Sequence, residues 1–165
     1  MKSKATVATI FAAIFIFAMC GTQPAYAAPP TDACSLLTPA QVSAALGVPV
    51  IGRNLGPKAC MWSQTGAKPG SALRRVDLVI LTMQGYTLAK TVAKTANAPT
   101  SMTPVSGLGD DAYYLAMASG PQYMEIRVKK GSVAFGIRVH RSRTFSVDQV
   151  KTKEKTLARD VLAKL

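Results

Sequence analysis

The chain has 165 residues and a formal net charge of +12, with 48% hydrophobic and 17% charged residues. This composition excludes a disordered tail, and the length suits a single domain. The only histidine, His140, excludes a His-rich metal site, and we expect neither a metal nor a cofactor.

Residues 1–27 are typical of a secretory signal peptide. Two lysines precede the uncharged run Val7–Cys20, which is shorter than the roughly 20 residues of a membrane span. Ala25-Tyr26-Ala27 then provides the small-x-small pattern at which signal peptidase cuts. We expect cleavage after Ala27 and export to the periplasm or the extracellular space, with no transmembrane helix in the mature chain.

Two alternatives to cleavage after Ala27 remain open. The segment could stay attached as an anchor helix, or the protein could be a lipoprotein acylated on Cys20. Met19 argues against lipidation, because Gly, Ala or Ser normally precedes a lipidated cysteine. Cleavage after Ala27 would remove Lys2 and Lys4 but no acid, so the mature chain would keep a net charge of +10.

Cleavage would leave two cysteines, Cys34 and Cys60. Two cysteines in an exported domain favour one disulfide. The bridge would close a loop of about 25 residues, worth roughly 3.5 kcal/mol if it acts by restricting the unfolded chain. A free reactive thiol would need a base nearby, and His140 lies 80 residues beyond Cys60.

The first half of the mature chain begins with a leader and a short helix. We expect residues 28–33 to be a flexible leader and residues 34–165 to form one domain. Thr38-Pro39-Ala40-Gln41 predicts a helix start with a capping box and Pro at the first helical position, and Gly47 ends this helix. Next we expect strands at Val48–Ile51, Ala59–Gln64 and Arg75–Met83, a helix at Thr87–Ala96, and a loop at Ala98–Gly109.

The second half predicts three strands and a long helix. The strands are Ala112–Met117, Tyr123–Lys129 and Val133–His140, and Ser146 with Gln149 forms a capping box that starts the helix. A two-residue turn at Lys130-Gly131 would set Val128 opposite Val133 and Ile126 opposite Phe135. The element order predicts an α+β domain, an antiparallel sheet with helices packed on one face.

Three stretches of the chain resemble a known group of proteins. They are Cys34-Ser35-Leu36-Leu37-Thr38, Cys60-Met61-Trp62 and Gly107-Leu108-Gly109-Asp110-Asp111-Ala112-Tyr113. They resemble small exported bacterial domains of unknown function, many of them lipoproteins. The resemblance implies an exported α+β domain with a Cys34–Cys60 bridge, and it brings no catalytic residues.

Few residues suggest catalysis. His140 lies two residues after Arg138 and directly before Arg141. The positive charge of these arginines favours a surface histidine over a metal ligand. Turn chemistry explains Asp110-Asp111 better than a calcium loop does. Trp62 is expected to pack near the disulfide, so we predict no catalytic residue and no metal ligand.

The surplus of basic residues is the main functional signal. Strand alternation directs Arg127, Lys129 and Arg138 away from the core, and Arg141 and Arg143 follow the last strand. These five residues predict a cationic face that recognises anionic envelope polymers or lipid head groups. Export excludes nucleic acid as the normal partner. The alternative is that the charge serves solubility alone.

The sequence therefore predicts a non-enzymatic exported domain, a binding module or an accessory protein of the cell envelope. The rival hypothesis is a small secreted hydrolase or enzyme inhibitor whose site is built from scattered residues. A cleft holding a perturbed acid near His140 would favour that rival.

Overall fold

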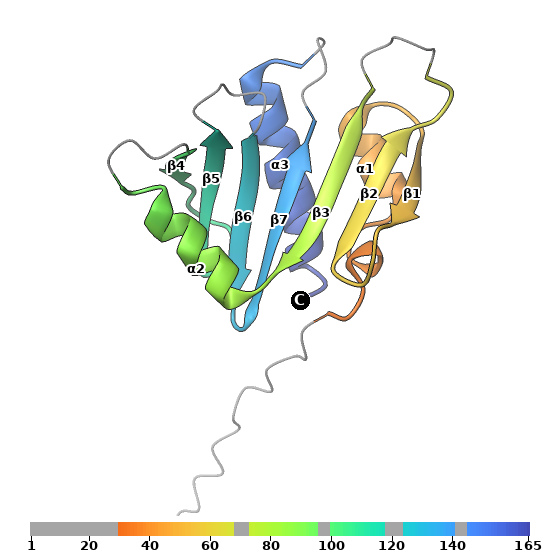
Figure 1. Cartoon of the computed structure of the whole chain (residues 1–165). Helices are drawn as coiled ribbons and strands as arrows, with labels where there is room; N and C mark the ends of the chain where they lie inside the picture. Colours follow the sequence, from red (N-terminus) through yellow and green to blue (C-terminus); the bar gives the residue numbers. More distant parts are fainter. Residues whose placement is uncertain (1–29, 68–72, 96–99, 118–123, 141–144) are drawn as a thin grey trace, which may run out of the picture.

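The computed structural model describes residues 30–67, 73–95, 100–117, 124–140 and 145–165 (Figure 1). Within these ranges, seven strands form one antiparallel sheet in the order β1-β2-β3-β7-β6-β5-β4. The strands are β1 Val50–Asn54, β2 Ala59–Gln64, β3 Arg75–Leu81, β4 Thr100–Pro104, β5 Asp111–Met117, β6 Met124–Lys130 and β7 Val133–Val139. The helices are η1 Ala33–Ser35, α1 Pro39–Leu46, α2 Met83–Val92 and α3 Val147–Leu162. The predicted α+β class and antiparallel sheet are confirmed.

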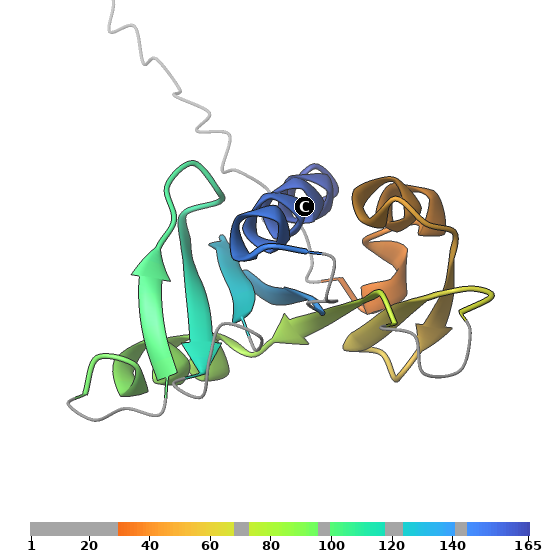
Figure 2. The same ribbon diagram turned by 90° about the horizontal axis from the view of Figure 1, so that it is seen from above.

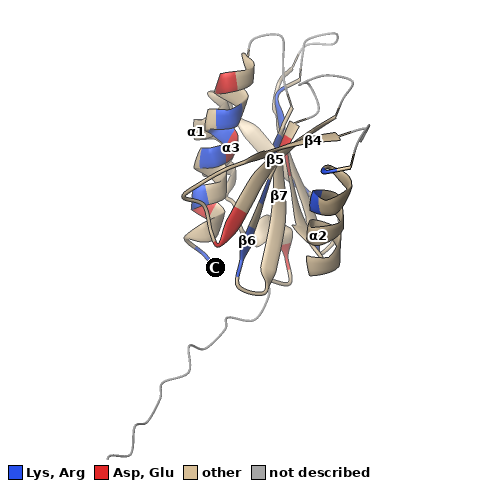
Figure 3. Ribbon diagram, turned by 90° about the vertical axis from the view of Figure 1, so that its left-hand side faces the viewer, with Lys and Arg blue, Asp and Glu red and all other residues tan. Residues whose placement is uncertain are grey.

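The helices lie on both faces of the sheet. Figures 2 and 3 show α1 and α3 on one face and α2 on the other. The face under α1 and α3 holds the main core, in which Trp62, Ile126 and Phe135 are buried. The prediction of helices on one face therefore fails for α2. The reason is Tyr86, which packs on Tyr113 of β5 across the second face, with the ring centroids 5.1 Å apart.

The predicted caps of α1 and α3 are confirmed. The Thr38 side chain accepts from the Gln41 N–H while the Gln41 side chain accepts from the Thr38 N–H, and Ser146 and Gln149 do the same at α3. Gly47 ends α1 in the left-handed region at φ 69°. α2 starts earlier than predicted because Thr82 caps it and accepts a hydrogen bond from the Gly85 N–H.

The segment predicted as a loop at Ala98–Gly109 contains a strand. β4 pairs antiparallel with β5 at the edge of the sheet, with Met102 opposite Leu115. Pro104, one of the two prolines and two glycines that suggested a loop, ends this edge strand. An edge strand tolerates proline because one row of its backbone groups has no ladder partner.

The register of the β6–β7 hairpin differs from the prediction. Val128 lies opposite Phe135 instead of Val133, and the two turn residues are Gly131 and Ser132. Gly131 takes φ 57°, and its N–H donates to Asp110 Oδ2 at 2.7 Å, which holds the turn one residue later than expected. The pairing shifts by two residues, so every side chain keeps its predicted face.

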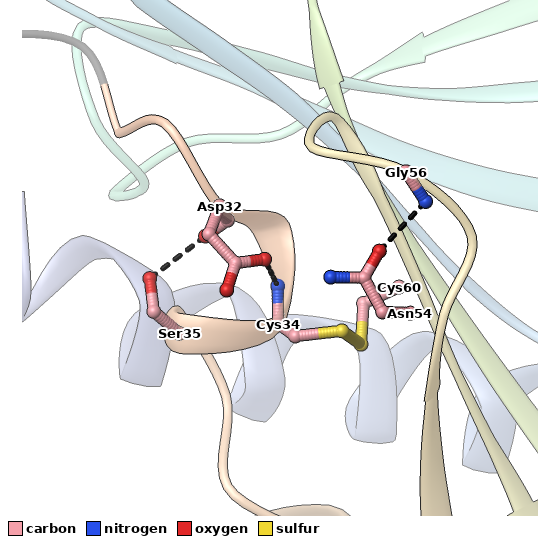
Figure 4. The surroundings of a disulfide bond; sticks show 6 residues. All are labelled: Asp32, Cys34, Ser35, Asn54, Gly56 and Cys60. Carbon is pink, nitrogen blue, oxygen red and sulfur yellow. Dashed lines mark hydrogen bonds between the residues drawn. A yellow bond between two sulfur atoms is a disulfide. The ribbon is translucent and has the colours of Figure 1, made fainter.

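The predicted disulfide is present and ties η1 to β2. Cys34 and Cys60 are bonded, with their Cα atoms 5.0 Å apart (Figure 4). Asp32 accepts a hydrogen bond from the Cys34 N–H, and Ala33 is buried and donates to the Pro57 carbonyl at 2.9 Å. Asp32 and Ala33 were predicted to be leader, but they belong to the domain. Residues 1–27, the predicted signal peptide, lie outside the described residues.

Candidate functional site

Three of the five predicted anion-binding residues lie on one side of the sheet. Met124, Ile126 and Val128 of β6 are buried in the main core, so the alternating Arg127 and Lys129 belong to the opposite face. We call this α2-bearing side of the sheet the outer face. Arg138 of β7 lies on it too. Arg141 follows β7, but it lies with Arg143 outside the described residues.

One carboxylate holds two of the predicted arginines. Arg127 Nε donates to Glu125 Oε1 at 2.7 Å, and Arg138 Nη2 donates to Glu125 Oε2 at 2.9 Å. The side chains of Glu125 and Arg127 are only 13% and 17% exposed, whereas that of Arg138 is 35% exposed. Arg127 is therefore not the free surface cation that the sequence predicts.

A glycine makes room for this carboxylate. Gly136 of β7 lies opposite Arg127, and a Cβ atom at Gly136 would come within 2.5 Å of Glu125 Oε1. Glu125 can therefore lie against the sheet between its two arginines. Burial alone would lower the pKa of Arg127, but the charge and hydrogen bond of Glu125 outweigh burial and raise it.

A second cluster surrounds Asp77 of β3. Its Oδ2 accepts from Arg75 Nη2 at 2.9 Å and lies 2.6 Å from His140 Nε2. Arg75 Nη2 also lies 2.9 Å from the same imidazole nitrogen. Burial raises the pKa of Asp77, but the hydrogen bonds and positive charge of His140 and Arg75 bring it below its ordinary value.

The two clusters adjoin across the sheet, because Asp77 is paired with Arg138 in the β3–β7 ladder. Together they hold three guanidinium groups and one imidazole but only two carboxylates. The two donors Arg75 Nε and Arg138 Nε and the one acceptor Asp77 Oδ1 are buried, with no hydrogen-bond partner among the described residues. The network thus has a surplus of positive charge and of donors.

Lys129 of β6 lies next to a residue that α2 contacts. It is paired with Asp111 of β5, whose carboxylate accepts from Lys90 Nζ at 2.6 Å and from the Tyr86 hydroxyl at 2.9 Å. The Lys90 hydrogen bond lowers the pKa of Asp111. The positive charge of Lys129 also lowers the pKa of Asp111, and Lys129 forms no ion pair with another described residue.

Sequence reasoning did not connect His140 to Asp77, since the two are 63 residues apart in the chain. The signal that could have joined them is the pairing of β3 with β7, which juxtaposes Arg75 and His140: the His140 N–H donates to the Arg75 carbonyl. Glu125 was the more accessible clue, because it lies two residues before Arg127 on β6 and therefore on the same face of the sheet. Trp62 is buried in the main core.

Other types of site find no support in the part of the chain that the structure describes. It contains no group of three or more His, Cys, Asp or Glu side chains that could hold a metal ion. No helix within it has both the length and the apolar character needed to cross a membrane. Two hollows of about 480 and 390 Å³ lie on α2 and between α1 and α3, away from the Asp77 and Glu125 clusters.

Comparison of the chain with protein families, curated proteins and solved structures found no match. The arguments about function therefore rest on the geometry of the outer face.

Proposed function

We propose that this protein is a non-enzymatic exported domain that binds anionic components of the cell envelope through its outer face. The observation that carries the proposal is the charge balance of the linked clusters, in which three arginines and His140 share Asp77 and Glu125. A phosphate or carboxylate of a ligand would supply the missing negative charge.

The arginines have different roles in this proposal. Arg75 and Arg138 are 36% and 35% exposed, so their guanidinium groups can reach a ligand. Arg127 is only 17% exposed and positions the Glu125 carboxylate. Lys129 is half-buried and adds charge beside the pair. The binding surface thus shifts from the predicted Arg127–Lys129–Arg138 set toward Arg75 and Arg138.

The compartment supports an envelope ligand. The Cys34–Cys60 disulfide is the kind of bond that persists in oxidising compartments such as the periplasm and the cell exterior. Envelope polymers and lipid head groups present repeated phosphates and carboxylates there. Attraction over about 8–10 Å at moderate salt makes such binding sensitive to ionic strength.

The test replaces one arginine on each side of the sheet, the partly exposed Arg138 or the exposed Arg159. Arg138→Gln should weaken binding to soluble polyphosphate by about fivefold at low salt, since a surface cation contributes on the order of 1 kcal/mol. Arg159→Gln is the matched control, because Arg159 is exposed on α3 and carries the same charge. Affinities are measured at 0.05 and 0.5 M salt, with folding checked by circular dichroism.

Equal losses in the two variants would mean that net charge alone attracts the polymer, and the proposed face would be wrong. Binding that ignores 0.5 M salt would also contradict the proposal, because the screening length there is about 4 Å.

A second function has one observation in its favour. The Asp77–His140 contact is an acid–imidazole pair of the kind that hydrolases use. However, no serine, threonine or cysteine among the described residues forms a hydrogen bond to His140. A hydrolase would lose ester, glycoside or peptide cleavage in His140→Gln and keep it in Arg138→Gln. Absence of cleavage by the parent protein would reject this candidate.

A further inference from the structure

The outer face is covered unevenly. α2 lies over β5 and β6, whereas no described element covers β1, β2 and β3 on this side (Figures 1 and 2). An apolar row crosses these three strands. The Leu55 N–H donates to the Ala59 carbonyl at 3.0 Å, and Ala59 is paired with Val79. Leu55 is 54% exposed and Val79 38% exposed.

The neighbouring positions on this surface extend the apolar character. Ile51 is 65% exposed and lies on the same side of β1 as Leu55, because the intervening Gly52 packs toward Trp62 of the core. Met61 of β2 lies half-buried on the same face, paired with Arg53. A sheet face that leaves large apolar side chains in water is typical of a contact surface.

Two cations lie close in sequence to the apolar side chains of this surface. Arg53 of β1 lies between Ile51 and Leu55 in the chain, and Lys58 is exposed in the β1–β2 turn. Neither forms an ion pair with another described residue. Asp77 is the only acid between Val48 and Leu81, a stretch that contains five Lys and Arg residues. Since Asp77 is already paired with Arg75 and His140, the surface is apolar and positive with no free acid.

We propose that this half of the outer face docks on an anionic lipid bilayer. Leu55, Val79 and Ile51 enter the boundary between head groups and acyl chains, while Arg53 and Lys58 contact lipid phosphates. The inference rests on the proposed function and narrows it, because it names a bilayer as the anionic partner.

The apolar and the positive side chains of this surface together favour a bilayer over other partners. A soluble polyanion has no apolar part to cover Leu55 and Val79. A second copy of the chain would bring Arg53 and Lys58 against like charges. A bilayer surface offers phosphates and an apolar layer together, and it conforms to side chains spread over a flat sheet.

The test compares two leucines of similar exposure, Leu55 at 54% and Leu88 at 59%. Leu55→Ser should weaken binding to vesicles of phosphatidylglycerol and phosphatidylcholine by about fivefold, the effect of losing partial burial of one leucine. Leu88→Ser is the matched control, because Leu88 is 59% exposed but lies on α2. It should leave vesicle affinity unchanged. The purified, disulfide-bonded protein is used, and vesicles of phosphatidylcholine alone measure the need for anionic lipid.

Two further variants separate packing from charge. Val79→Thr keeps the side-chain shape and the strand propensity, so it should fold and still weaken vesicle binding. Arg53→Gln should weaken binding to anionic vesicles by about fivefold at low salt. The leucine and valine variants should bind soluble polyphosphate as the parent does.

The outcomes distinguish this inference from the proposed function. If the parent binds polyphosphate but Leu55→Ser and Leu88→Ser bind vesicles equally well, bilayer docking is wrong and anion binding stands. If the parent binds neither polyphosphate nor anionic vesicles, both proposals are wrong. Capture of a lipid-free envelope protein that is lost in Leu55→Ser would assign the surface to a protein partner and overturn docking on lipid.

Discussion

Two glutamates on opposite faces of the sheet show how differently the faces treat a charge. Glu154 of α3 is fully buried in the main core, where its Oε1 accepts from the Val139 N–H at 2.9 Å. Its Oε2 has no hydrogen-bond partner among the described residues. Burial raises the pKa of Glu154 to about 9. Glu125 on the outer face instead holds Arg127 and Arg138 with both oxygens.

The difference lies in what surrounds each carboxylate. Apolar side chains of α3 and the sheet enclose Glu154, so its neutral form costs less than an ion with one hydrogen bond. Each oxygen of Glu125 accepts a hydrogen bond from a guanidinium group on the outer face. The main core thus favours a neutral Glu154, whereas the outer face pairs Glu125 with Arg127 and Arg138.

The largest expected effect concerns the disulfide on the covered side. Replacing Cys34 and Cys60 by alanine should lower the free energy of unfolding by about 3.5 kcal/mol, because the bridge restricts the unfolded chain. The two residues are 26 apart in sequence. Urea denaturation measures the loss. Two alkylatable thiols in protein recovered from the periplasm or medium would contradict the bridge.

The second prediction tests the neutral state of Glu154. Its folded-state pKa lies above its unfolded value, so the folded state favours the protonated acid. The stability due to protonation is complete below about pH 4.5 and is lost as pH rises toward 9. Glu154→Gln cannot ionise. Relative to Glu154→Gln, the parent should therefore lose about 4 kcal/mol between pH 5 and pH 8.

The control for this titration is Asp148→Asn, an exposed acid in the first turn of α3. It should follow the parent over the same pH range. A constant difference between the parent and Glu154→Gln from pH 5 to pH 8 would show that Glu154 does not titrate there.

The smallest expected effects test the Glu125 cluster. Glu125→Gln should cost about 2 kcal/mol, less than a fully buried ion pair because Arg138 is partly exposed. Gly136→Ala should cost about 1 kcal/mol by pushing the carboxylate away from its arginines. If both act through the same carboxylate, the double variant should lose less than the sum of the two. Urea denaturation provides all three values, and strict additivity would separate Gly136 from Glu125.

Local signals predicted much of the fold. Thr38 with Gln41 and Ser146 with Gln149 predicted the starts of α1 and α3, because capping needs only residues three apart. Alternation placed Arg127 and Arg138 on the face away from Phe135. The register of β6–β7 was wrong by two residues, since Asp110, 21 residues away, holds the turn at Gly131.

The amino-acid sequence by itself determined the elements bounded by caps and alternation, the Cys34–Cys60 pairing and the direction of the outer arginines. Only the tertiary structure decided which charges are used and which are available. Asp77 reaches His140 from 63 residues away, and Gly136 makes room for the Glu125 carboxylate. The physical reason is that ion pairing depends on strand neighbours, and strands β3 and β7 become neighbours only when the sheet forms.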